Sequence, residues 1–333
     1  MGEGYPFDYI QLSVLWTGTP VMLLQTTKDG KWVLVKGQGT MGWIPASHVA
    51  KVDKNFVYQW KHSKFVTPTV RKQDLLIHRN NVKDEILEAG SVLPARYGNI
   101  QVPIRDASGQ ARLITVETSN LKLAPWPMKP SYKNFAEKIN SLIGMPYGWG
   151  GKDFNNDCSG LLRRLFISFG IWLPRSSYWQ ANYMGTLYSL YGESESQRKD
   201  WLIDQNGPTS LVPFMTLVSF GNNQTSTSHI GLYMGTTKYN NQEVAVIFNA
   251  PWGVQLVNDN SEHGRAFVGQ TLITPVGIGD EFSTGLSEQG WSLMSLWARV
   301  GFNVTLLTQP PEKKQLQAVP SSSSSVKQYL LWK

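Results

Sequence analysis

Cys158 is the only cysteine of the chain and the strongest candidate for a nucleophile. It opens a segment whose apolar residues recur at helical spacing as far as Phe169, and Asp157 before it is placed to cap that helix. Free backbone N–H groups and the helix dipole favour a thiolate here, which is the nucleophilic form of cysteine. A small buried hydrophobe is the other interpretation, and one cysteine excludes internal disulfides and multi-thiolate metal sites.

A thiolate nucleophile needs an acid–base partner, and His229 is the best placed of the five histidines. It opens the apolar strand 229–234 after a polar loop, so its ring is expected to face a cleft and to be held rigidly. An ordinary surface residue is the alternative for His229. Solvated surface positions are expected for the other four, His48, His62, His78 and His263.

Catalytic imidazoles are oriented by a polar group on the nitrogen remote from the nucleophile. Asn249 ends the predicted strand 243–248. If the two strands are adjacent and antiparallel, Asn249 is expected to accept a hydrogen bond from the Nδ1–H of His229. A plain turn residue is the competing interpretation of Asn249.

The residues just before Cys158 form a turn of small residues that carries two rings, Tyr147 and Trp149, among Gly148, Gly150 and Gly151. Such a turn could bring backbone and an aromatic wall close to a substrate. We therefore count Trp149 among the candidate substrate-binding residues.

Short strands and tight turns fill the first part of the chain. Residues 8–58 contain the strands 21–24, 32–35 and 42–45, with the hairpin signal Asp29-Gly30 between the first two. Residues 59–125 repeat the pattern, with strands at 75–77, 100–104 and 113–116. This spacing predicts two small β-barrels. Three prolines in 125–130 then predict a stiff linker and a domain boundary.

Residues 126–308 change character and predict an α+β domain. Phe135, Ile139 and Leu142-Ile143 are spaced for one face of a helix, and the strong helix 157–169 and the strands 229–234 and 243–248 follow. The last segment, 309–333, is polar and contains the run Ser321–Ser325, so it is predicted to be a flexible tail.

Four blocks of this domain, in their order, resemble the NlpC-type cell-wall cysteine peptidases. The blocks are Tyr147-x-Trp149-Gly150-Gly151, Asp157-Cys158-Ser159-Gly160, Leu173-Pro174-Arg175-Ser176-Ser177-x-x-Gln180 and Ser228-His229-Ile230-Gly231-Leu232-Tyr233. Residues 16–45 resemble the bacterial SH3-like module that precedes such domains, and the second module resembles it more loosely. The resemblance implies two SH3-like barrels followed by a papain-like α+β peptidase domain.

The resemblance also implies roles for individual residues. Cys158 would be the nucleophile, His229 the base, Asn249 the orienting group, and Tyr147 a wall of the cleft near the forming oxyanion. Substrate contacts would come from Asp157 and Ser159, which bind an N-terminal L-alanine in relatives, and from Ser177. Because the SH3-like module walls off the cleft in such enzymes, Trp16 is a further candidate.

The implied reaction is hydrolysis of the bond between γ-D-glutamate and a diamino acid, meso-diaminopimelate or lysine, in peptidoglycan stem peptides or muropeptides. Peptides with a free N-terminal L-alanine are the expected substrates, and no metal or organic cofactor is expected. An N-acetylmuramoyl-L-alanine amidase or an acyltransferase with the same catalytic parts stays open, as does a non-catalytic wall-binding protein. The family's usual Gly-Asp-Leu block is replaced by residues 213–218, and 181–212 form a polar insertion, either a lid or a partner-binding segment.

The formal net charge of +7 suits polyanionic partners, but the lysines and arginines are scattered, which argues against a dedicated nucleic-acid role. No run of about 18 apolar residues occurs, so no membrane span is predicted. The first residues do not read as a signal peptide. We therefore expect an extracytoplasmic protein, in the periplasm or cell wall, if a leader is removed, and a cytoplasmic one otherwise; a monomer is expected.

Overall fold

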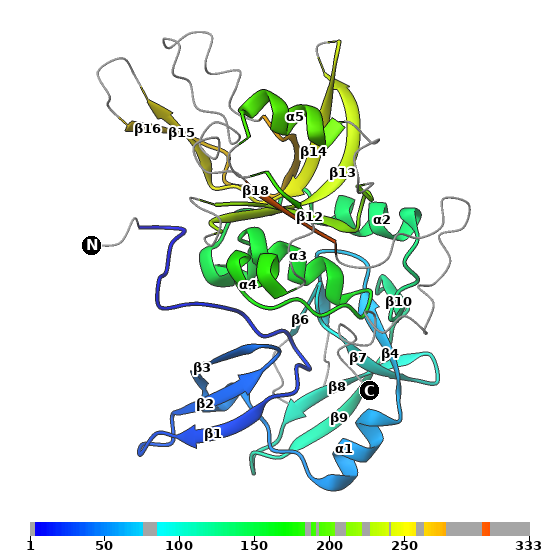
Figure 1. Ribbon diagram of the computed structural model, residues 1–333. Helices are drawn as coiled ribbons and strands as arrows, with labels where there is room; N and C mark the ends of the chain where they lie inside the picture. The colour runs from blue at the N-terminus through cyan, green and yellow to red at the C-terminus, as the bar shows by residue number, and fades with distance from the viewer. Residues whose placement is uncertain are drawn as a thin grey trace. The chain divides into compact units, whose positions relative to one another are not determined.

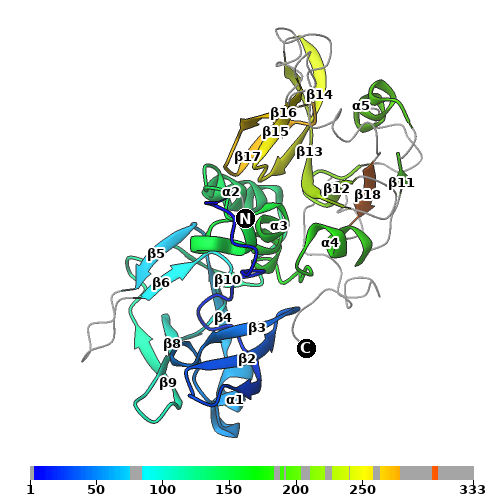
Figure 2. The same ribbon diagram turned by 90° about the vertical axis from the view of Figure 1, so that its left-hand side faces the viewer.

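The computed structural model describes residues 4–75, 85–183, 188–190, 193–203, 211–221, 227–239, 241–257, 263–277 and 302–306 (Figures 1 and 2). Its internal contacts divide the chain into two compact units. Among the described residues, unit 1 comprises 4–14, 131–162 and 175–306, and unit 2 comprises 15–130 and 163–174. None of the helices in these ranges is long and apolar enough to cross a membrane.

Unit 2 begins with a three-stranded antiparallel sheet of β1, β2 and β3. These strands are Met22–Thr26, Trp32–Gly37 and Thr40–Pro45, close to the predicted ones. Gly30 has φ +69° in the first hairpin turn. This is the positive φ that the Asp-Gly pair predicts for such a turn. Alternation along β2 buries Val33 and Val35 on one face of the sheet.

The second sheet of unit 2 has the order β10-β4-β7-β8-β9. Its strands are Leu123–Trp126, Lys64–Pro68, Leu93–Arg96, Asn99–Arg105 and Ala111–Val116. The short strands β5 (Lys72–Leu75) and β6 (Glu85–Glu88) pair with each other. Apolar side chains form the core of this part, namely Leu87, Leu93, Ile100, Val102 and Val116. Leu76 and Ile77 of the predicted strand 75–77 lie outside the described residues.

Two features of unit 2 differ from the sequence prediction. Helix α1 (Lys54–Lys61) was not predicted; Asp53 caps it by accepting a hydrogen bond from the Phe56 N–H at 2.7 Å, and the single turn Ala46–His48 precedes it. The predicted linker 125–130 begins within β10, where Pro125 and Trp126 pair with β4. Pro125 fits there because β10 is an edge strand of its sheet. The division into two barrels near residue 58 stays a prediction.

Residues 163–174 complete unit 2. Arg164 is fully buried and forms an ion pair with Glu88 at 2.7 Å. The guanidinium groups of Arg163 and Arg164 lie 5.3 and 5.6 Å from the ring of Trp16. The indole N–H of Trp126 donates to the Ile167 carbonyl at 2.6 Å.

Unit 1 is built on an antiparallel sheet with the order β11-β18-β12-β13-β14-β17. Its strands are Tyr188–Ser189, Phe302–Leu306, Thr216–Phe220, His229–Tyr239, Gln242–Asn249 and Leu272–Pro275. The strands β15 (Gly253–Val257) and β16 (His263–Phe267) form a separate hairpin. The prediction that the strands starting at His229 and ending at Asn249 are antiparallel neighbours is confirmed.

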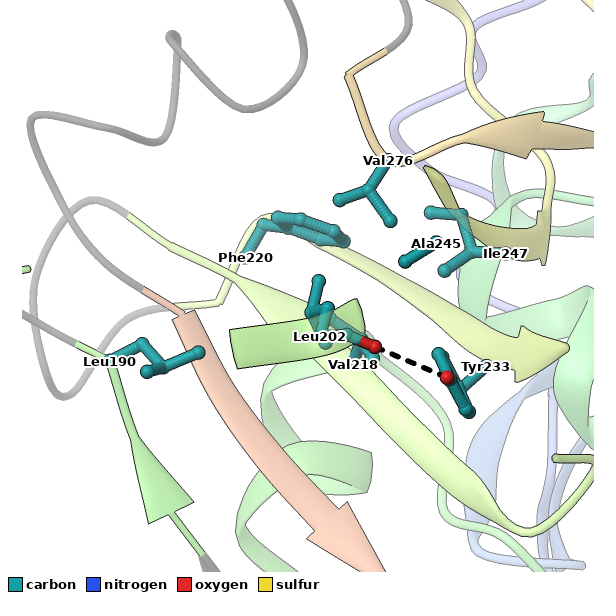
Figure 3. Close-up of a cluster of buried hydrophobic side chains, with 8 residues drawn as sticks. All are labelled: Leu190, Leu202, Val218, Phe220, Tyr233, Ala245, Ile247 and Val276. Atoms are coloured by element: carbon teal, nitrogen blue, oxygen red, sulfur yellow. Dashed lines mark hydrogen bonds between the residues drawn. The ribbon is translucent and has the colours of Figure 1, made fainter. Parts of the chain in front are cut away.

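Helices cover both faces of this sheet (Figures 1 and 2). Helix α5 (Glu195–Ile203) lies on β14, and α4 (Ser177–Tyr183) lies against β12 and β13 from the other side. The face under α5 is a compact apolar cluster of Leu190, Leu202, Val218, Phe220, Tyr233, Ala245, Ile247 and Val276 (Figure 3). The buried Tyr233 hydroxyl donates a hydrogen bond to the Leu202 carbonyl at 3.2 Å, as a buried polar group requires. Both helices fall in the stretch 177–203, which was predicted only as a motif and a polar insertion.

Helix α2 (Tyr132–Leu142) buries Phe135, Ile139 and Leu142, as their spacing predicts, and Ser131 caps its start. Ile143 follows the helix as its C-cap and is exposed, so its predicted place on this face was wrong. Helix α3 (Cys158–Ile167) ends two residues earlier than predicted, and Gly170 with φ +74° follows it as the predicted stop. Because the unit boundary falls after Leu162, the first residues of α3 belong to unit 1 and the rest to unit 2. The predicted tail 309–333 lies outside the described residues.

Candidate active site

Cys158 is the first residue of α3, and Asp157 is the N-cap of this helix. The Asp157 carbonyl accepts from the Leu161 N–H at 2.9 Å, and its carboxylate Oδ1 accepts from the Gly160 N–H at 2.8 Å. Both bonds are those of an N-cap aspartate, so the prediction from sequence is confirmed at this point. The cysteine thus lies in the first turn, where the backbone N–H groups of the helix are free to stabilise negative charge.

His229 is the first residue of β13, and the start of this strand lies at the thiol. The backbone N–H of Ile230, the residue after His229, lies near enough to the Cys158 sulfur to lower the pKa of the thiol. Phe220 is the partner of His229 in the neighbouring strand, with 5.8 Å between the two ring centres. The fold therefore brings together the start of α3 and the start of β13, which carry the two residues predicted to act together.

Asn249 fixes the tautomer of His229. The Asn249 side-chain Nδ2 donates to the Ile247 carbonyl at 3.2 Å and lies 3.0 Å from Thr274 Oγ1. A carbonyl can only accept, so the other end of the amide, Oδ1, faces His229 Nε2 at 3.2 Å. Oδ1 has no proton, so Nε2 carries the imidazole hydrogen and Nδ1 keeps its lone pair. The prediction that Asn249 holds Nδ1–H was wrong about which nitrogen it binds.

Burial keeps both reactive groups uncharged. It raises the pKa of Cys158 to about 12, and the negative charge of Asp157 adds to the rise. Arg175 and the N–H groups of Ile230 and Ser159 act in the opposite direction. Burial also lowers the pKa of His229 to about 4, against smaller upward contributions from the Asn249 hydrogen bond and the Asp157 charge.

The expectation of a thiolate at neutral pH is therefore wrong for the free site. The charge of Arg175 and the N–H groups of Ile230 and Ser159 favour a charged sulfur, but the loss of hydration on burial outweighs them. The resting pair is a thiol beside a neutral imidazole with a free Nδ1 lone pair. Such a pair can attack a carbonyl if the base takes the thiol proton as the sulfur–carbon bond forms.

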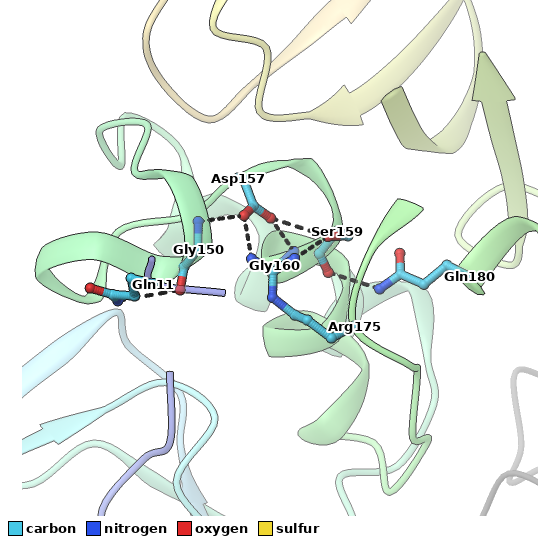
Figure 4. A network of polar contacts seen from close by, with 7 residues as sticks. All are labelled: Gln11, Gly150, Asp157, Ser159, Gly160, Arg175 and Gln180. Carbon is cyan, nitrogen blue, oxygen red and sulfur yellow. Dashed lines mark hydrogen bonds and ion pairs between the residues drawn. The ribbon is translucent and has the colours of Figure 1, made fainter. Parts of the chain in front are cut away.

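The carboxylate of Asp157 is the centre of a polar network (Figure 4). It accepts from the Gly150 N–H at 2.9 Å, the Gly160 N–H at 2.8 Å and the Ser159 hydroxyl at 3.2 Å, and it forms an ion pair with Arg175. The guanidinium of Arg175 also donates to the Ser159 hydroxyl. Asp157 and Ser159, both predicted to bind a substrate, are thus already engaged with the protein's own donors.

Arg175 is the residue of this network to which the sequence assigned no role. It was noticed as part of the block 173–180, but nothing in its neighbourhood along the chain indicated a partner. The available signal was its charge: the side chain is only 14% exposed, and a buried guanidinium requires a carboxylate.

Tyr147 and Trp149 lie in an aromatic cluster with residues of the first segment of the chain. Phe7 has its ring centre 5.8 Å from Tyr147, 5.9 Å from Trp149 and 5.3 Å from Trp252. Tyr9 meets Trp149 edge-on at 5.5 Å. The predicted aromatic turn thus exists, and the segment 4–14, which the sequence assigned in part to the first barrel, packs on it within unit 1.

The same segment fits closely over the two glycines of the turn. Gly150 and Gly151 have φ +65° and +84°, and a Cβ on Gly150 would lie 1.8 Å from the Gln11 carbonyl oxygen. The Gln11 side-chain amide donates to the Gly150 carbonyl at 3.3 Å. Only glycine allows both this backbone conformation and this approach.

The remaining candidates lie as follows. The Ser177 hydroxyl, at the start of α4, donates to the Thr227 carbonyl at 3.1 Å. Gln180 is buried and donates to the Ser159 carbonyl at 2.9 Å, which ties α4 to the residue after the cysteine. Trp16 belongs to unit 2, where its ring is 4% exposed and lies against the two arginines described above.

Comparison with known proteins gives two family matches. Residues 144–258 match the NlpC/P60 family, and residues 1–45 match the SH3 domain of SH3b1 type. No curated protein matches the chain. An SH3 domain followed by an NlpC/P60 domain is thus the order of the chain.

Two solved structures are similar to the chain. A novel NlpC/P60 endopeptidase from Photobacterium damselae subsp. piscicida is 65% identical, with a TM-score of 0.88 over 93% of this chain and 68% of that one. An NlpC/P60 family protein from Bacillus cereus is 16% identical, with a TM-score of 0.55 over 86% of this chain and 79% of that one, and is similar in fold.

Proposed function

The chain belongs to the NlpC/P60 family, and from this membership we propose that it is a cell-wall cysteine endopeptidase acting on the γ-D-glutamyl–diamino acid bond of peptidoglycan stem peptides. The diamino acid would be meso-diaminopimelate or lysine. The observation that carries the proposal is the contact between His229 Nε2 and Asn249 Oδ1 at 3.2 Å, because it gives the imidazole at the start of β13 the orienting partner that a cysteine peptidase needs.

In the first half of the reaction Cys158 Sγ attacks the γ-carbonyl carbon while its proton passes to His229 Nδ1. The carbonyl oxygen becomes an oxyanion, held by the Cys158 backbone N–H with Tyr147 beside it. The imidazolium then gives its proton to the leaving amine of the diamino acid. The carbon–nitrogen bond breaks, and a thioester on Cys158 remains.

The second half releases the acyl group. Water loses a proton to Nδ1 and its oxygen attacks the thioester carbon, and the departing sulfur recovers that proton. Asn249 keeps Nε2 protonated throughout, so Nδ1 is the nitrogen that takes and returns the proton in both halves. The thiol and the neutral imidazole are restored together.

The expected preference for a free N-terminal L-alanine depends on Asp157 and Ser159. A substrate ammonium would compete there with Arg175, which already neutralises the carboxylate. The geometry therefore gives this preference no support of its own, and the experiment below includes both the free and the sugar-linked peptide. Ser177, Trp149 and Trp16 stay proposed substrate contacts.

The proposal includes the modular organisation predicted from the sequence, with SH3-like barrels at 8–58 and 59–125 and a papain-like domain at 126–308. The antiparallel sheets of unit 2 and the helix–sheet arrangement of unit 1 support it. Wall binding by the barrels would keep the peptidase at its polymer.

The test is mass spectrometry of the products from defined stem peptides, with and without the N-acetylmuramoyl group. An endopeptidase releases the diamino acid end and leaves L-alanyl-D-glutamate, free or on the sugar. An amidase would instead release the whole stem peptide from the sugar. Retention on purified sacculi with no product from either substrate would contradict a catalytic role. Cys158→Ala and His229→Ala are the controls, and each is expected to abolish measurable turnover.

A further inference from the structure

We propose that Arg175 is a positioning residue that sets the reactivity of the Cys158 thiol by neutralising the carboxylate of Asp157. The inference rests on Cys158 being the nucleophile, as proposed above, but not on which bond the enzyme cuts. The guanidinium of Arg175 binds Asp157 and Ser159, and it acts on the thiol of Cys158 through them.

The geometry places the guanidinium on both chain neighbours of the cysteine. One terminal nitrogen of Arg175 forms the ion pair with Asp157 Oδ2, and the other donates to Ser159 Oγ (Figure 4). The Ser159 hydroxyl in turn donates to Asp157 Oδ1 at 3.2 Å. The three side chains close a ring of polar contacts that joins the two chain neighbours of Cys158.

The charges of Asp157 and Arg175 make this ring matter for the reactivity of the Cys158 thiol. The side chains of Asp157 and Arg175 are 8% and 14% exposed, so water screens them little. An unpaired carboxylate directly before Cys158 would oppose formation of a thiolate, while the guanidinium favours it, and the two act on the sulfur in these opposite directions. The other ionisable group at the thiol, His229 on β13, is neutral.

A purely structural role for Arg175 would predict something different. The Asp157 carboxylate already has three donors besides Arg175, so the N-cap of α3 does not depend on the guanidinium. A structural role would change folding but leave the reactivity of the folded thiol as it is. Reactivity, measured without any substrate, therefore separates the two.

The experiment measures alkylation of Cys158 by iodoacetamide in the whole chain, followed by mass spectrometry between pH 6.5 and 9.5. The variants are Arg175→Gln, Arg175→Lys and the double variant Asp157→Asn/Arg175→Gln. Arg112→Gln is the matched control, because Arg112 pairs with Asp106 on the exposed surface of unit 2. Circular dichroism and a thermal melt confirm that each variant is folded.

Arg175→Gln is expected to slow alkylation about tenfold or more at each pH and to displace the profile about one unit to higher pH. Arg175→Lys keeps the charge and should stay within about threefold of the unmodified protein, and the double variant should recover to a similar rate because the opposing carboxylate is gone. Should Arg175→Gln not fold, Arg175→Met takes its place, with the same expected slowing and the same criterion. An unchanged profile in folded Arg175→Gln overturns the inference, and so does a double variant that stays as slow as the single one.

The outcome is independent of the bond specificity. If alkylation follows the expected order while no wall peptide is cleaved, the proposed reaction fails and the role of Arg175 stands. If wall peptides are cleaved but the alkylation rate is the same with and without Arg175, the proposed reaction stands and the role of Arg175 fails.

Discussion

The thiol of Cys158 and the imidazole of His229 are both kept uncharged at neutral pH by their surroundings. A preformed ion pair would need hydration that the buried ring of His229 lacks. What the fold supplies instead is a correctly oriented proton acceptor, because Asn249 determines which ring nitrogen is free. The chemistry of this site is thus set by orientation more than by charge.

Asn249→Ala is expected to lower kcat/KM on the order of 10²-fold, because the imidazole loses the group that fixes its tautomer. Steady-state hydrolysis of a stem peptide measures this. Thr274→Val removes one partner of the Asn249 amide but leaves its bond to the Ile247 carbonyl, so it should change kcat/KM less than about threefold. Equal effects of the two substitutions would contradict the tautomer argument.

Burial of His229 also makes stability depend on pH. Its pKa is about 4 in the folded chain against 6.5 when exposed, so the unfolded chain binds the proton more readily. Stability is complete above about pH 6.5 and is lost as the pH falls from there to about 4, by about 3 kcal/mol in total.

Urea unfolding of unit 1 at pH 7.5 and 4.5 tests this, with His229→Gln as the comparison. The variant has no group to titrate and should lose about 2.5 kcal/mol less between the two pH values than the unmodified protein. If both lose stability equally, His229 is not the group responsible.

Among the elements, the turn 147–151 connects the most parts of the site. It bears two rings of the aromatic cluster, its Gly150 N–H binds the Asp157 carboxylate, and the segment 4–14 packs over its glycines. Displacing the segment 4–14 would therefore also disturb the N-cap of α3.

Gly150→Ala is expected to destabilise unit 1 by at least about 2 kcal/mol more than Gly144→Ala does, and to lower kcat/KM. Gly144 is the matched control because it has φ +77° but open space around its Cα, so it reports backbone strain alone. Thermal melts and peptide hydrolysis measure both effects. A Gly150→Ala protein as stable as Gly144→Ala would show that the segment does not press on the turn.

Local patterns were enough to predict many elements but not their surroundings. Apolar spacing and the Asp157 cap predicted α3, Asp29-Gly30 predicted the first hairpin, and the neighbouring strands ending in His229 and Asn249 were confirmed. The thiolate expectation was wrong because burial is a property of the folded chain. Arg175 and the segment 4–14 were missed because their partners lie far away in the sequence.

In the whole chain, helix α3 belongs to two units. Its first residues carry the nucleophile in unit 1, while Arg163 and Arg164 form part of unit 2 with Trp16 and Glu88. Arg164 is fully buried, and its charge has Glu88 as an ion-pair partner. The second half of α3 therefore depends on residues that lie far before it in the sequence, such as Trp16 and Glu88.

A fragment that begins at residue 131 is accordingly expected to be poorly soluble or unfolded, although it contains every residue of the proposed catalytic pair. Glu88→Gln in the whole chain should cost about 3–5 kcal/mol, because it leaves a buried guanidinium without a countercharge. Asp106→Asn removes the acidic partner of an exposed arginine and should cost less than about 1 kcal/mol. Denaturant titration gives both values, and a well-folded fragment would contradict the dependence.

The docking of residues 4–14 within unit 1 has a consequence for biosynthesis. These residues leave the ribosome before all of 15–130, yet the turn that they cover is made only afterwards. Unit 2 in turn lacks residues 163–174 until translation has passed Cys158. Neither unit can finish folding before residues 163–174 have been synthesised, so a nascent chain stalled earlier would expose unfinished cores to chaperones and proteases.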